Sequence, residues 1–383
     1  MLLQFLVYLA WLLIAASAFG CAYLWYASHA VVRFARRVIP SDPAQPAVSI
    51  LKPLRGEDPA LMDNLRSFCR QAYGRYQIVF GVADADDPAV PVIRRLEEEF
   101  PESDITLVVE PSHGGANLKI ANLRNMLPAA RHDVFVLADS DMRVGPDYLT
   151  AVVAPIEYGA GLVTCLYRGL SAGGFCSDIA SLHINHGFLP QAVVADSLGL
   201  GAGCFGATMA FGRETLARTG GFDALADVLA DDHELGQAVG RLGLEVVLSP
   251  YIVDDIVAEA DFGALFRHEL RWARTIRLVA PGGFIGSVVT FPVPLAALAV
   301  LLGAFAVPPL VMLLLALLCR ALTAARIDRA LRLNRAPVWI LPVRDMLSFG
   351  VFIASFFGRG VAWRDHYFRI GPNGQLVLDA KKS

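Results

Sequence analysis

Hydrophobic residues form two different patterns along the chain. Between residues 48 and 260, short apolar runs alternate with longer mixed stretches, whereas both ends of the chain carry long apolar runs. The short runs predict buried strands at 48–51, 78–82, 105–109, 134–138, 162–167 and 246–248. The mixed stretches predict helices at 58–71, 88–100, 117–126, 177–195 and 229–242. Because strands alternate with helices, we expect residues 48–260 to form an α/β domain with a mostly parallel sheet.

The first 27 residues predict an N-terminal transmembrane helix. The first 26 carry no charged side chain and are long enough to cross ~30 Å of hydrocarbon. Three arginines follow this run, Arg33, Arg36 and Arg37. The positive-inside rule then places the following domain in the cytoplasm. The alternative is a cleaved signal peptide, suggested by small residues at 15–18, but no basic segment precedes the run and the run continues past them.

Further membrane segments are predicted after the central domain. A proline-containing linker is expected at 28–47, and the C-terminal pattern predicts two membrane helices at 284–322, a basic cytoplasmic loop at 323–337 and a tail at 359–383. The apolar segment 338–358 contains Arg344 and Asp345, whose charges are costly in hydrocarbon. This third C-terminal segment therefore crosses the membrane, lies at its interface or re-enters it, and the sequence leaves these alternatives open.

Two aspartates follow the apolar run at 134–138. Asp139 and Asp141 are two positions apart, so their side chains point the same way in an extended chain. Ligands of open α/β folds bind at this carboxyl edge of the sheet. Two carboxylates there suit a divalent cation that also contacts phosphate oxygens. The alternative for so short a motif is a solvated turn.

A second predicted strand, at 78–82, is also followed by an acid, Asp84, so the acidic edge is repeated in the same sheet. Gly114, Gly115 and Lys119 lie between the two strands in the sequence. Glycines let a backbone approach a ligand closely, and the Lys119 ammonium group is suited to phosphate charge. The alternative for this stretch is an ordinary loop and helix cap.

The segment Gly201–Gly206 matches G-x-G-x-x-G but is not expected to bind a dinucleotide. A strand-like run follows it, whereas a dinucleotide site requires the glycines to open a helix. We interpret the segment as a flexible glycine floor under a substrate. No P-loop sequence is present, which argues against a nucleoside triphosphatase.

Acidic residues at 231–234 open the predicted helix 229–242. Acids in a first helical turn often only complement the helix dipole. Three acids within four residues exceed what capping needs, so one of them is a candidate general base. An ionised aspartate held near a hydroxyl group can deprotonate it.

Residues 261–283 predict an amphipathic helix at the membrane interface. Four arginines recur along it at three- and four-residue spacing: Arg267, Arg271, Arg274 and Arg277. One interpretation is a surface helix that contacts acidic lipid headgroups. Another places Arg271 and Trp272 at an active site, where a guanidinium group offsets phosphate charge. The two interpretations are compatible.

A polar cluster interrupts the predicted helix 177–195 at His183, Asn185 and His186. One interpretation is a pair of buried histidines with satisfied hydrogen bonds. The other is a group at an acceptor site or beside a metal, for which His186 is the better candidate.

Composition narrows the class of protein. The chain is 55% hydrophobic and only 18% charged, which is too apolar for a purely soluble protein. Its formal net charge of −3 gives no overall attraction for nucleic acid. The six cysteines show no metal-ligand spacing, which fits a reducing compartment and argues against a disulfide framework.

Four of these features occur in one order along the chain. They are Asp84, the pair Asp139 and Asp141, Asp232, and the segment His268-Glu269-Leu270-Arg271-Trp272. This order resembles the membrane-bound inverting glycosyltransferases with a D, D, D, (Q/R)xxRW signature. The segments 49–54, 84–88, 117–122 and 139–144 are similar to the ceramide glucosyltransferase family and to bacterial hopanoid-biosynthesis glycosyltransferases.

The resemblance implies a GT-A fold, a UDP-sugar donor and Mg²⁺ or Mn²⁺. Carried over by position, Asp84 would contact the uracil or ribose, and Asp139 and Asp141 would hold the diphosphate through the metal. Asp232 would be the catalytic base. Lys119, His268, Arg271 and Trp272 would bind the donor, and His186 matches a histidine near the acceptor more weakly. His268 departs from the family pattern, which has Gln or Arg there, so it needs a suitable tautomer or charge state to donate to phosphate.

The expected function is inverting transfer of a hexose, glucose or N-acetylglucosamine, from a UDP-sugar to a hydroxyl of a membrane lipid. Ceramide or a bacteriohopanetetrol-type hopanoid is the expected acceptor, and the expected location is a bacterial inner membrane with the catalytic domain in the cytoplasm. A processive polysaccharide synthase would need more membrane helices to form a channel. A non-catalytic membrane scaffold would not need the four aspartates.

Overall fold

The chain contains two compact units in the computed structural model, which describes residues 1–38, 44–56, 58, 60–111, 114–200, 203–334, 337, 339–358, 360–363, 366–370 and 376–378. The helical unit comprises Met1–Arg36, Phe175–Ser197 and Glu259–Arg359. The sheet unit comprises Arg37–Gly174, Leu198–Ala258 and Gly360–Ser383. Parts of the predicted linker and tail, His113, and the start of the G-x-G-x-x-G segment lie outside the described residues.

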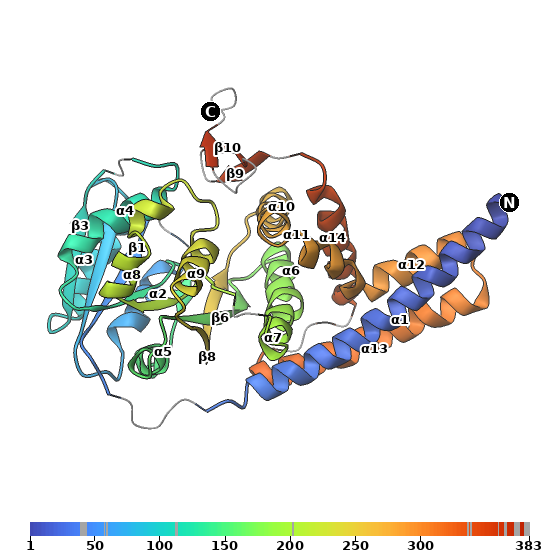
Figure 1. Ribbon diagram of the computed structural model, residues 1–383, viewed down its shortest axis with the longest axis horizontal. Helices are drawn as coiled ribbons and strands as arrows, with labels where there is room; N and C mark the ends of the chain where they lie inside the picture. Colours follow the sequence, from blue (N-terminus) through green and yellow to red (C-terminus); the bar gives the residue numbers. More distant parts are fainter. Residues whose placement is uncertain are drawn as a thin grey trace. The chain divides into compact units, whose positions relative to one another are not determined.

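The sheet unit, part of which carries labels β1, β3, β6 and β8 in Figure 1, is built on one mixed sheet. This sheet has eight strands in the order β3-β2-β1-β4-β7-β6-β8-β5. Its strands are β1 (Val48–Pro53), β2 (Tyr76–Val82), β3 (Asp104–Val109), β4 (Val134–Leu137), β5 (Met142–Arg143), β6 (Leu162–Ser171), β7 (Met209–Gly212) and β8 (Val246–Val257). The pairs β3-β2, β2-β1, β1-β4 and β6-β8 are parallel. The pairs β4-β7, β7-β6 and β8-β5 are antiparallel, so the sheet is mixed but mostly parallel, as the sequence predicts.

Helices cover both faces of this sheet. They are α2 (Leu61–Cys69), α3 (Ala89–Glu99), α4 (Leu118–Met126), α5 (Tyr148–Glu157), α8 (Arg213–Arg218) and α9 (Asp231–Arg241). Side chains of α2, α3 and α5 share one buried cluster, while those of α4, α8 and α9 share another. The sequence did not indicate α5 or the two-residue strand β5.

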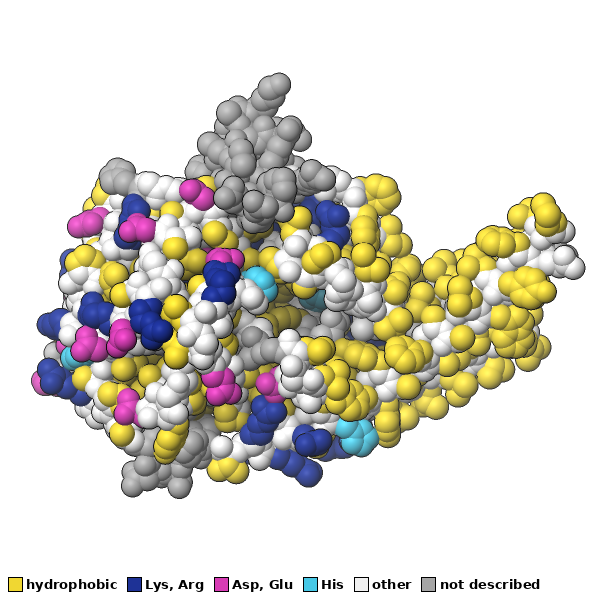
Figure 2. Space-filling model, in the orientation of Figure 1, with side chains coloured by type: hydrophobic (Ala, Val, Ile, Leu, Met, Phe, Trp, Pro, Cys, Tyr) yellow, Lys and Arg dark blue, Asp and Glu magenta, His cyan; other side chains and the backbone are white. Residues whose placement is uncertain are grey.

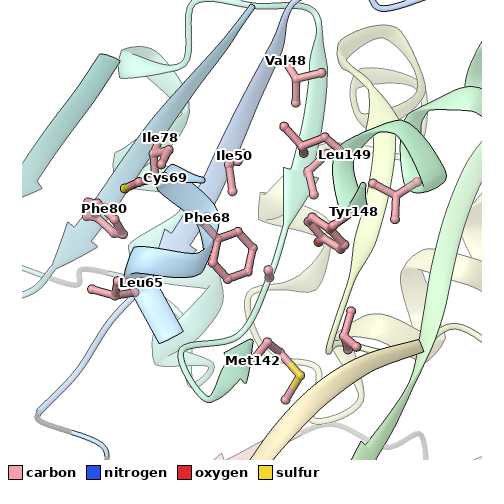
Figure 3. Packing of buried hydrophobic residues seen from close by; sticks show 14 of the residues in the cluster. Val48, Ile50, Leu65, Phe68, Cys69, Ile78, Phe80, Met142, Tyr148 and Leu149 are labelled. Atoms are coloured by element: carbon pink, nitrogen blue, oxygen red, sulfur yellow. The ribbon is translucent and has the colours of Figure 1, made fainter. Parts of the chain in front are cut away.

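Alternation along the strands separates the two cores. Ile50 of β1 joins the cluster that contains Phe68 and Tyr148, as Figure 3 shows, whereas its neighbour Leu51 joins the opposite cluster. Ile50 and Leu51 are both fully buried. Burial on both faces explains why these strands are continuous apolar runs. The two buried clusters hold the strands between them, and the polar residues that follow each strand lie at the edge of the sheet.

The helical unit contains the long apolar segments of both chain ends. Its elements are α1 (Leu2–Phe34), α6 (Phe175–His183), a π-helical turn (Ile184–Phe188), α7 (Leu189–Ser197), α10 (Phe262–Val279), α11 (Pro281–Gly286), α12 (Pro292–Leu302), α13 (Val307–Leu331) and α14 (Ile340–Ser355). Residues 175–197 therefore belong to the helical unit, whereas the sequence predicted a continuous catalytic domain over residues 48–260. The reason is that α6 and α7 pack with helices of this unit and not on the sheet.

Two described helices are long and apolar enough to cross a membrane, Gln4–Phe34 and Val307–Leu331. The bent pair Pro281–Thr290 and Pro292–Leu302, with an angle of 66°, is a possible third span. Apolar side chains cover the exposed surface of the long helices α1 and α13 in Figure 2. Such a surface is suited to lipid.

The helix boundaries differ from the predicted segments in two places. α1 continues to Phe34, beyond residue 27, and α13 continues to Leu331, so much of the predicted basic loop at 323–337 is helical. Arginine is a good helix former, so the basic residues that follow each apolar run continue the helix. The predicted tail contains a small antiparallel sheet of β9 (Gly360–Trp363), β10 (His366–Ile370) and β11 (Leu376–Leu378).

Candidate active site

The candidate site of the sheet unit begins where β4 ends. β1 lies between β2 and β4 in parallel register, so the carboxyl ends of these strands share one edge. Lys52, a fully buried residue near the end of β1, donates from Nζ to the backbone oxygen of Asp139 at 2.7 Å. Burial lowers the pKa of Lys52 to about 7, against the opposing effect of Asp141 and Asp139. The lysine thus fixes the backbone of the predicted acidic pair.

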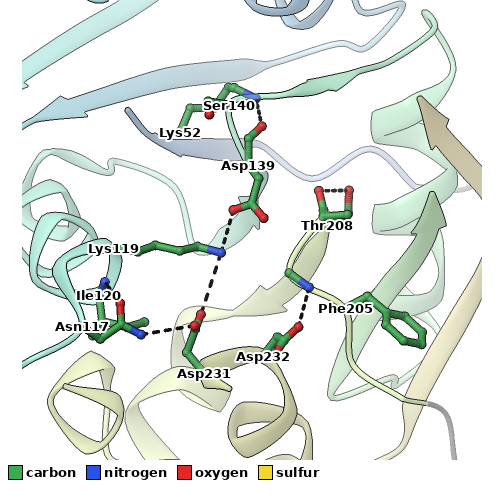
Figure 4. A network of polar contacts seen from close by, with 12 residues as sticks. Lys52, Asn117, Lys119, Ile120, Asp139, Ser140, Phe205, Thr208, Asp231 and Asp232 are labelled. Atoms are coloured by element: carbon green, nitrogen blue, oxygen red, sulfur yellow. Dashed lines mark hydrogen bonds and ion pairs between the residues drawn. The ribbon is translucent and has the colours of Figure 1, made fainter. Parts of the chain in front are cut away.

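Lys119 connects two acidic elements of the site (Figure 4). Its Nζ lies 2.6 Å from Asp139 Oδ1 and 3.8 Å from Asp231 Oδ2. Burial alone would lower the pKa of Lys119, but Asp139 and Asp231 together raise it above its usual value. The side chain of Asn117 caps α4 and also donates to Asp231 Oδ1 at 3.2 Å. The start of α4 and the start of α9 are therefore held together beside β4.

Asp232 is fixed by two backbone N–H groups. Gly206 N donates to its Oδ2 at 2.9 Å, and His233 N donates to its Oδ1 at 2.7 Å. Burial, and then the neighbouring charge of Asp231, raise the pKa of Asp232 to about 6. A carboxylate with this pKa is ionised at neutral pH and is more basic than an ordinary aspartate.

Three side chains converge on Gly206. A Cβ atom at this position would lie 3.3 Å from Lys119 Nζ, 3.4 Å from Asp139 Oδ2 and 3.5 Å from Asp232 Oδ2. The missing side chain leaves room beside these groups, so a ligand can approach the backbone closely. The end of β4, the start of α4 and the start of α9 therefore meet beside Gly206.

Asp141 meets the chemical requirements of a metal ligand. Its Oδ1 is buried and has no hydrogen-bond partner among the described residues. Burial, and then the charges of Asp139 and Asp58, raise its pKa to about 7. A cation bound there would offset this concentration of negative charge. No group of three or more His, Cys, Asp or Glu side chains is arranged to hold a metal within the described ranges, but two carboxylates suffice when substrate phosphates complete the ligand set.

Asp84 lies at the same edge of the sheet but in a different environment. It follows β2, and its Oδ1 accepts a hydrogen bond from Asp86 N at 3.0 Å in a local turn. Its side chain is exposed, in contrast to the partly buried Asp139. Asp84 thus follows β2, which is separated from β4 and Asp139 by the single strand β1.

The H-x-x-R-W segment lies on α10 of the helical unit. His268 Nδ1 is 2.7 Å from Glu259 Oε1, and the His268 and Trp272 rings meet edge to face with centroids 4.5 Å apart. His183 of α6 stacks on the Trp272 ring at a centroid distance of 6.5 Å. Arg271 lies between His268 and Trp272 in the sequence, and its side chain is half-buried. His268 and Trp272 lie one helical turn apart, so the helix brings their rings together.

His186 lies in the π-helical turn of the helical unit and is buried. Its Nε2 is 3.0 Å from Asp328 Oδ1 of α13. Burial lowers the pKa of this imidazole below its usual value. His186 therefore lies beside Asp328 in a buried environment, but its Nδ1 has no hydrogen-bond partner among the described residues, so the two alternatives that the sequence left open remain open.

Sequence reasoning missed four residues of these arrangements: Lys52, Gly206 as a contact of Asp232, Asp231 as a partner of Lys119, and Glu259. Lys52 carried a usable signal because it follows an apolar strand at the ligand edge. Asp231 lies in the acidic segment 231–234 and Gly206 in the G-x-G-x-x-G segment. Their partners, Lys119 and Asp232, are distant from them in the sequence. Nothing in the local sequence pairs Glu259 with a histidine nine residues later.

The chain is similar to known glycosyltransferases over most of its length. A family profile described as Glycosyl transferase family 21 matches residues 12–376. Ceramide glucosyltransferase 3 of Caenorhabditis elegans is 22% identical over 363 residues, which cover 88% of this chain and 76% of that protein. Ceramide glucosyltransferase 1 of the same organism is 23% identical over 248 residues, covering 64% of this chain. The match spans 53% of that protein, about half of its length.

A solved structure with similarity across the chain is that of the mannosyltransferase PcManGT from Pyrobaculum calidifontis in complex with GDP-Man and Mn²⁺. Its TM-score is 0.53 at 20% sequence identity, with 92% of this chain and 99% of that chain covered. At this identity the likeness establishes the fold and not the substrate.

Proposed function

The chain belongs to glycosyl transferase family 21 and has the GT-A fold, and on this premise we propose that it transfers a hexose from a UDP-sugar to a hydroxyl of a membrane lipid with inversion. The observation that carries the proposal is the convergence of Lys119, Asp139 and Asp232 on Gly206. This arrangement combines a candidate base with groups suited to a diphosphate. A non-catalytic scaffold would not need these charged groups to converge.

Asp232 is the proposed catalytic base. The N–H groups of Gly206 and His233 fix its carboxylate, and its raised pKa makes it a better proton acceptor at neutral pH. It takes the proton of the acceptor hydroxyl while that oxygen attacks the anomeric carbon from the face opposite the diphosphate. The bond to the diphosphate breaks in the same displacement, so the configuration inverts. A single base is sufficient, whereas a retaining glycosidase requires two carboxylates about 5 Å apart.

The donor diphosphate is proposed to bind at the edge of the sheet. Asp139 and Asp141 would hold Mg²⁺ or Mn²⁺, and when bound this cation would supply positive charge to the leaving group. Lys119 contributes a fixed ammonium group at the same edge. Asp84 would contact the uracil or ribose, and Arg271 and Trp272 would line the diphosphate, as in the family that the motifs resemble.

Glucose or N-acetylglucosamine is the proposed sugar, and ceramide or a hopanoid polyol is the proposed acceptor. Ceramide is supported by the names of the two nematode relatives. The apolar helices α1 and α13 allow the lipid tail to remain in the bilayer during transfer. Arg33 in the last turn of α1, Arg36 just after it, and Arg329 and Arg332 at the end of α13 support an orientation with these ends in the cytoplasm of a bacterial inner membrane.

The test offers the purified full chain UDP-glucose, UDP-N-acetylglucosamine and GDP-mannose, each with ceramide and with bacteriohopanetetrol. Product mass identifies the donor and the acceptor together, and the anomeric configuration of the product reports inversion. We expect one added hexose, or N-acetylhexosamine, from a UDP-sugar. Transfer only from GDP-mannose would correct the donor, and a ladder of added sugars would indicate a polysaccharide synthase. A lack of transfer from every nucleotide sugar would contradict the proposal.

A further inference from the structure

A cavity of about 350 Å³ lies between α2 and the segment 143–146, both of which belong to the sheet unit. The residues that line it include three arginines and one acid: Arg66, Arg70, Arg143 and Asp63. The three side chains that converge on Gly206 are not among the described residues that line it. Asp63 and Arg70 are exposed, so a ligand can reach the cavity from solution. Its size is that of a small-ligand site.

The guanidinium group of Arg143 is held at one end and open at the other. Its Nε donates to Oδ1 of Asn64, a fully buried residue, at 3.2 Å. Its two Nη atoms form no hydrogen bond or ion pair with the described part of the chain. The residue opposite Arg143 in β8 is Asp254, which is already paired with Arg168 at 2.5 Å. Arg143 therefore presents two fixed donor groups that no described carboxylate receives.

The other two arginines of the cavity differ in how far their charges are already paired. Arg66 donates from Nε and Nη2 to the two Glu99 oxygens at 2.7 and 2.8 Å, and from Nη1 to Asp63. Arg70 is exposed, and its Nη2 lies 3.5 Å from Glu99 Oε1. Three guanidinium groups thus stand against two carboxylates, so this cluster has a net positive charge. Such a cluster attracts an anion.

The chemistry of these groups selects the kind of anion. A guanidinium group binds an oxyanion through two parallel N–H···O bonds, a geometry that suits phosphate and carboxylate. A phosphate monoester carries a charge of about −1.5 to −2 at pH 7, so it gains more than a carboxylate from two guanidinium groups.

We propose that Arg143 and Arg70 bind a phosphate-monoester group in this cavity, with Arg143 as the fixed contact. The group belongs to a soluble phosphate compound or to a lipid headgroup, and the chemistry that recognises it is the same for both. This site is separate from the one proposed for the donor diphosphate. Its ligand takes no part in the transfer step.

The experiment locates phosphate binding by hydrogen–deuterium exchange in the full chain, held in phosphatidylcholine nanodiscs. Inorganic phosphate and glycerol phosphate are the soluble ligands, and nanodiscs that also contain phosphatidic acid supply the headgroup. We expect at least one of them to slow exchange in the peptides that cover α2 and residues 142–146, because binding stabilises the structure around it. Protection by the soluble ligands alone identifies a soluble source, and protection by phosphatidic acid alone identifies a lipid. Protection by none of them, or only outside this cavity, would overturn the proposal.

Two variants change the cavity in opposite directions. R143Q removes the fixed guanidinium group, so the affinity for the ligand found above should fall about tenfold or more. R143K keeps the charge but loses the paired donors, so its loss should be smaller. D63N removes the acid that lines the cavity and releases Nη1 of Arg66, so it should bind the ligand more tightly than the wild type. A gain in affinity is not a result that misfolding produces.

R94Q is the matched control. Arg94 lies on α3 and is paired with Glu97, and its side chain is 61% exposed, close to the 63% of Arg70. Its replacement should leave the affinity unchanged. Equal affinities in R143Q and R94Q would show that the bound anion does not use Arg143, and would overturn the proposal. None of these measurements requires transfer, so their outcome is independent of the proposed function.

Discussion

Arg344 and Glu269 form a buried bidentate ion pair between α14 and α10. Arg344 Nη1 and Nη2 lie 2.5 and 2.6 Å from the two Glu269 oxygens, and the residues are 1% and 5% exposed. The next residue of α14, Asp345, pairs with Arg320 of α13, whose Nε lies 3.0 and 2.9 Å from the two carboxylate oxygens. Two adjacent charges of opposite sign thus join α14 to two different helices. Glu269 lies inside the H-x-x-R-W segment, so the pair also anchors the motif helix.

Breaking this pair from one side is expected to destabilise the helical unit. E269Q leaves the Arg344 guanidinium buried without its counter-charge, and the loss for such a change is about 3–5 kcal/mol. The double variant E269M/R344M replaces both charges by apolar side chains and should be much less destabilised. Thermal unfolding in detergent micelles, followed by circular dichroism, measures both. A double variant that is less stable than E269Q would contradict this account.

The sequence predicted the sheet better than the polar contacts. The continuous apolar run before Asp139 was sufficient to place a buried strand and the acid pair at its end, because burial on both faces leaves a local pattern. The pairs Lys119–Asp139, Glu259–His268 and Glu269–Arg344 leave no such pattern, because each joins residues that only the tertiary fold brings together. For the same reason the sequence made the charges of Arg344 and Asp345 look costly in an apolar segment. Their partners, Glu269 and Arg320, lie on other helices.

Replacing the proposed base is expected to abolish transfer. D232N keeps the shape of the side chain and an oxygen that can accept from Gly206 N, but it cannot take a proton. General base catalysis contributes about 10²–10⁴-fold to rate, so kcat should fall by at least two orders of magnitude. Donor binding, measured by calorimetry with the nucleotide sugar, should remain within a few-fold of the wild type. Full turnover by D232N would assign the base elsewhere.

The pH dependence of transfer should have an acid limb set by Asp232. Its pKa is raised to about 6 by burial and by Asp231, so the basic, ionised form is lost as pH falls through 6. D231N removes the neighbouring charge, which should lower the pKa of Asp232 and move the acid limb to lower pH. Asparagine at 231 can still accept from Asn117 Nδ2, which limits the structural effect. An acid limb unchanged in D231N would show that another group controls it.

Removal of divalent cations is expected to abolish transfer, with recovery on addition of Mn²⁺ or Mg²⁺. D141N replaces the carboxylate whose Oδ1 is buried without a hydrogen-bond partner in the described part of the chain. If Asp141 is a ligand, this variant should need a higher metal concentration for half-maximal activity, by about tenfold or more. D63N, at an exposed acid of α2, should not. Activity that survives a chelator, with removal of metal verified by elemental analysis, would contradict the metal site.

Gly206 provides the most direct test of the space shared by the three side chains. In G206A the new methyl would lie 3.3–3.5 Å from Lys119 Nζ, Asp139 Oδ2 and Asp232 Oδ2, which is tight but not a severe clash. We therefore expect a folded protein with a melting temperature near that of the wild type and a large loss of kcat/KM, because the methyl occupies room that the ligand needs. G240A is the matched control: Gly240 lies within α9, a Cβ atom there would meet nothing within 4 Å, and alanine favours the helix by about 1 kcal/mol. It should keep wild-type activity and gain stability. Equal activity of G206A and G240A would mean that the substrate does not use the space beside Gly206.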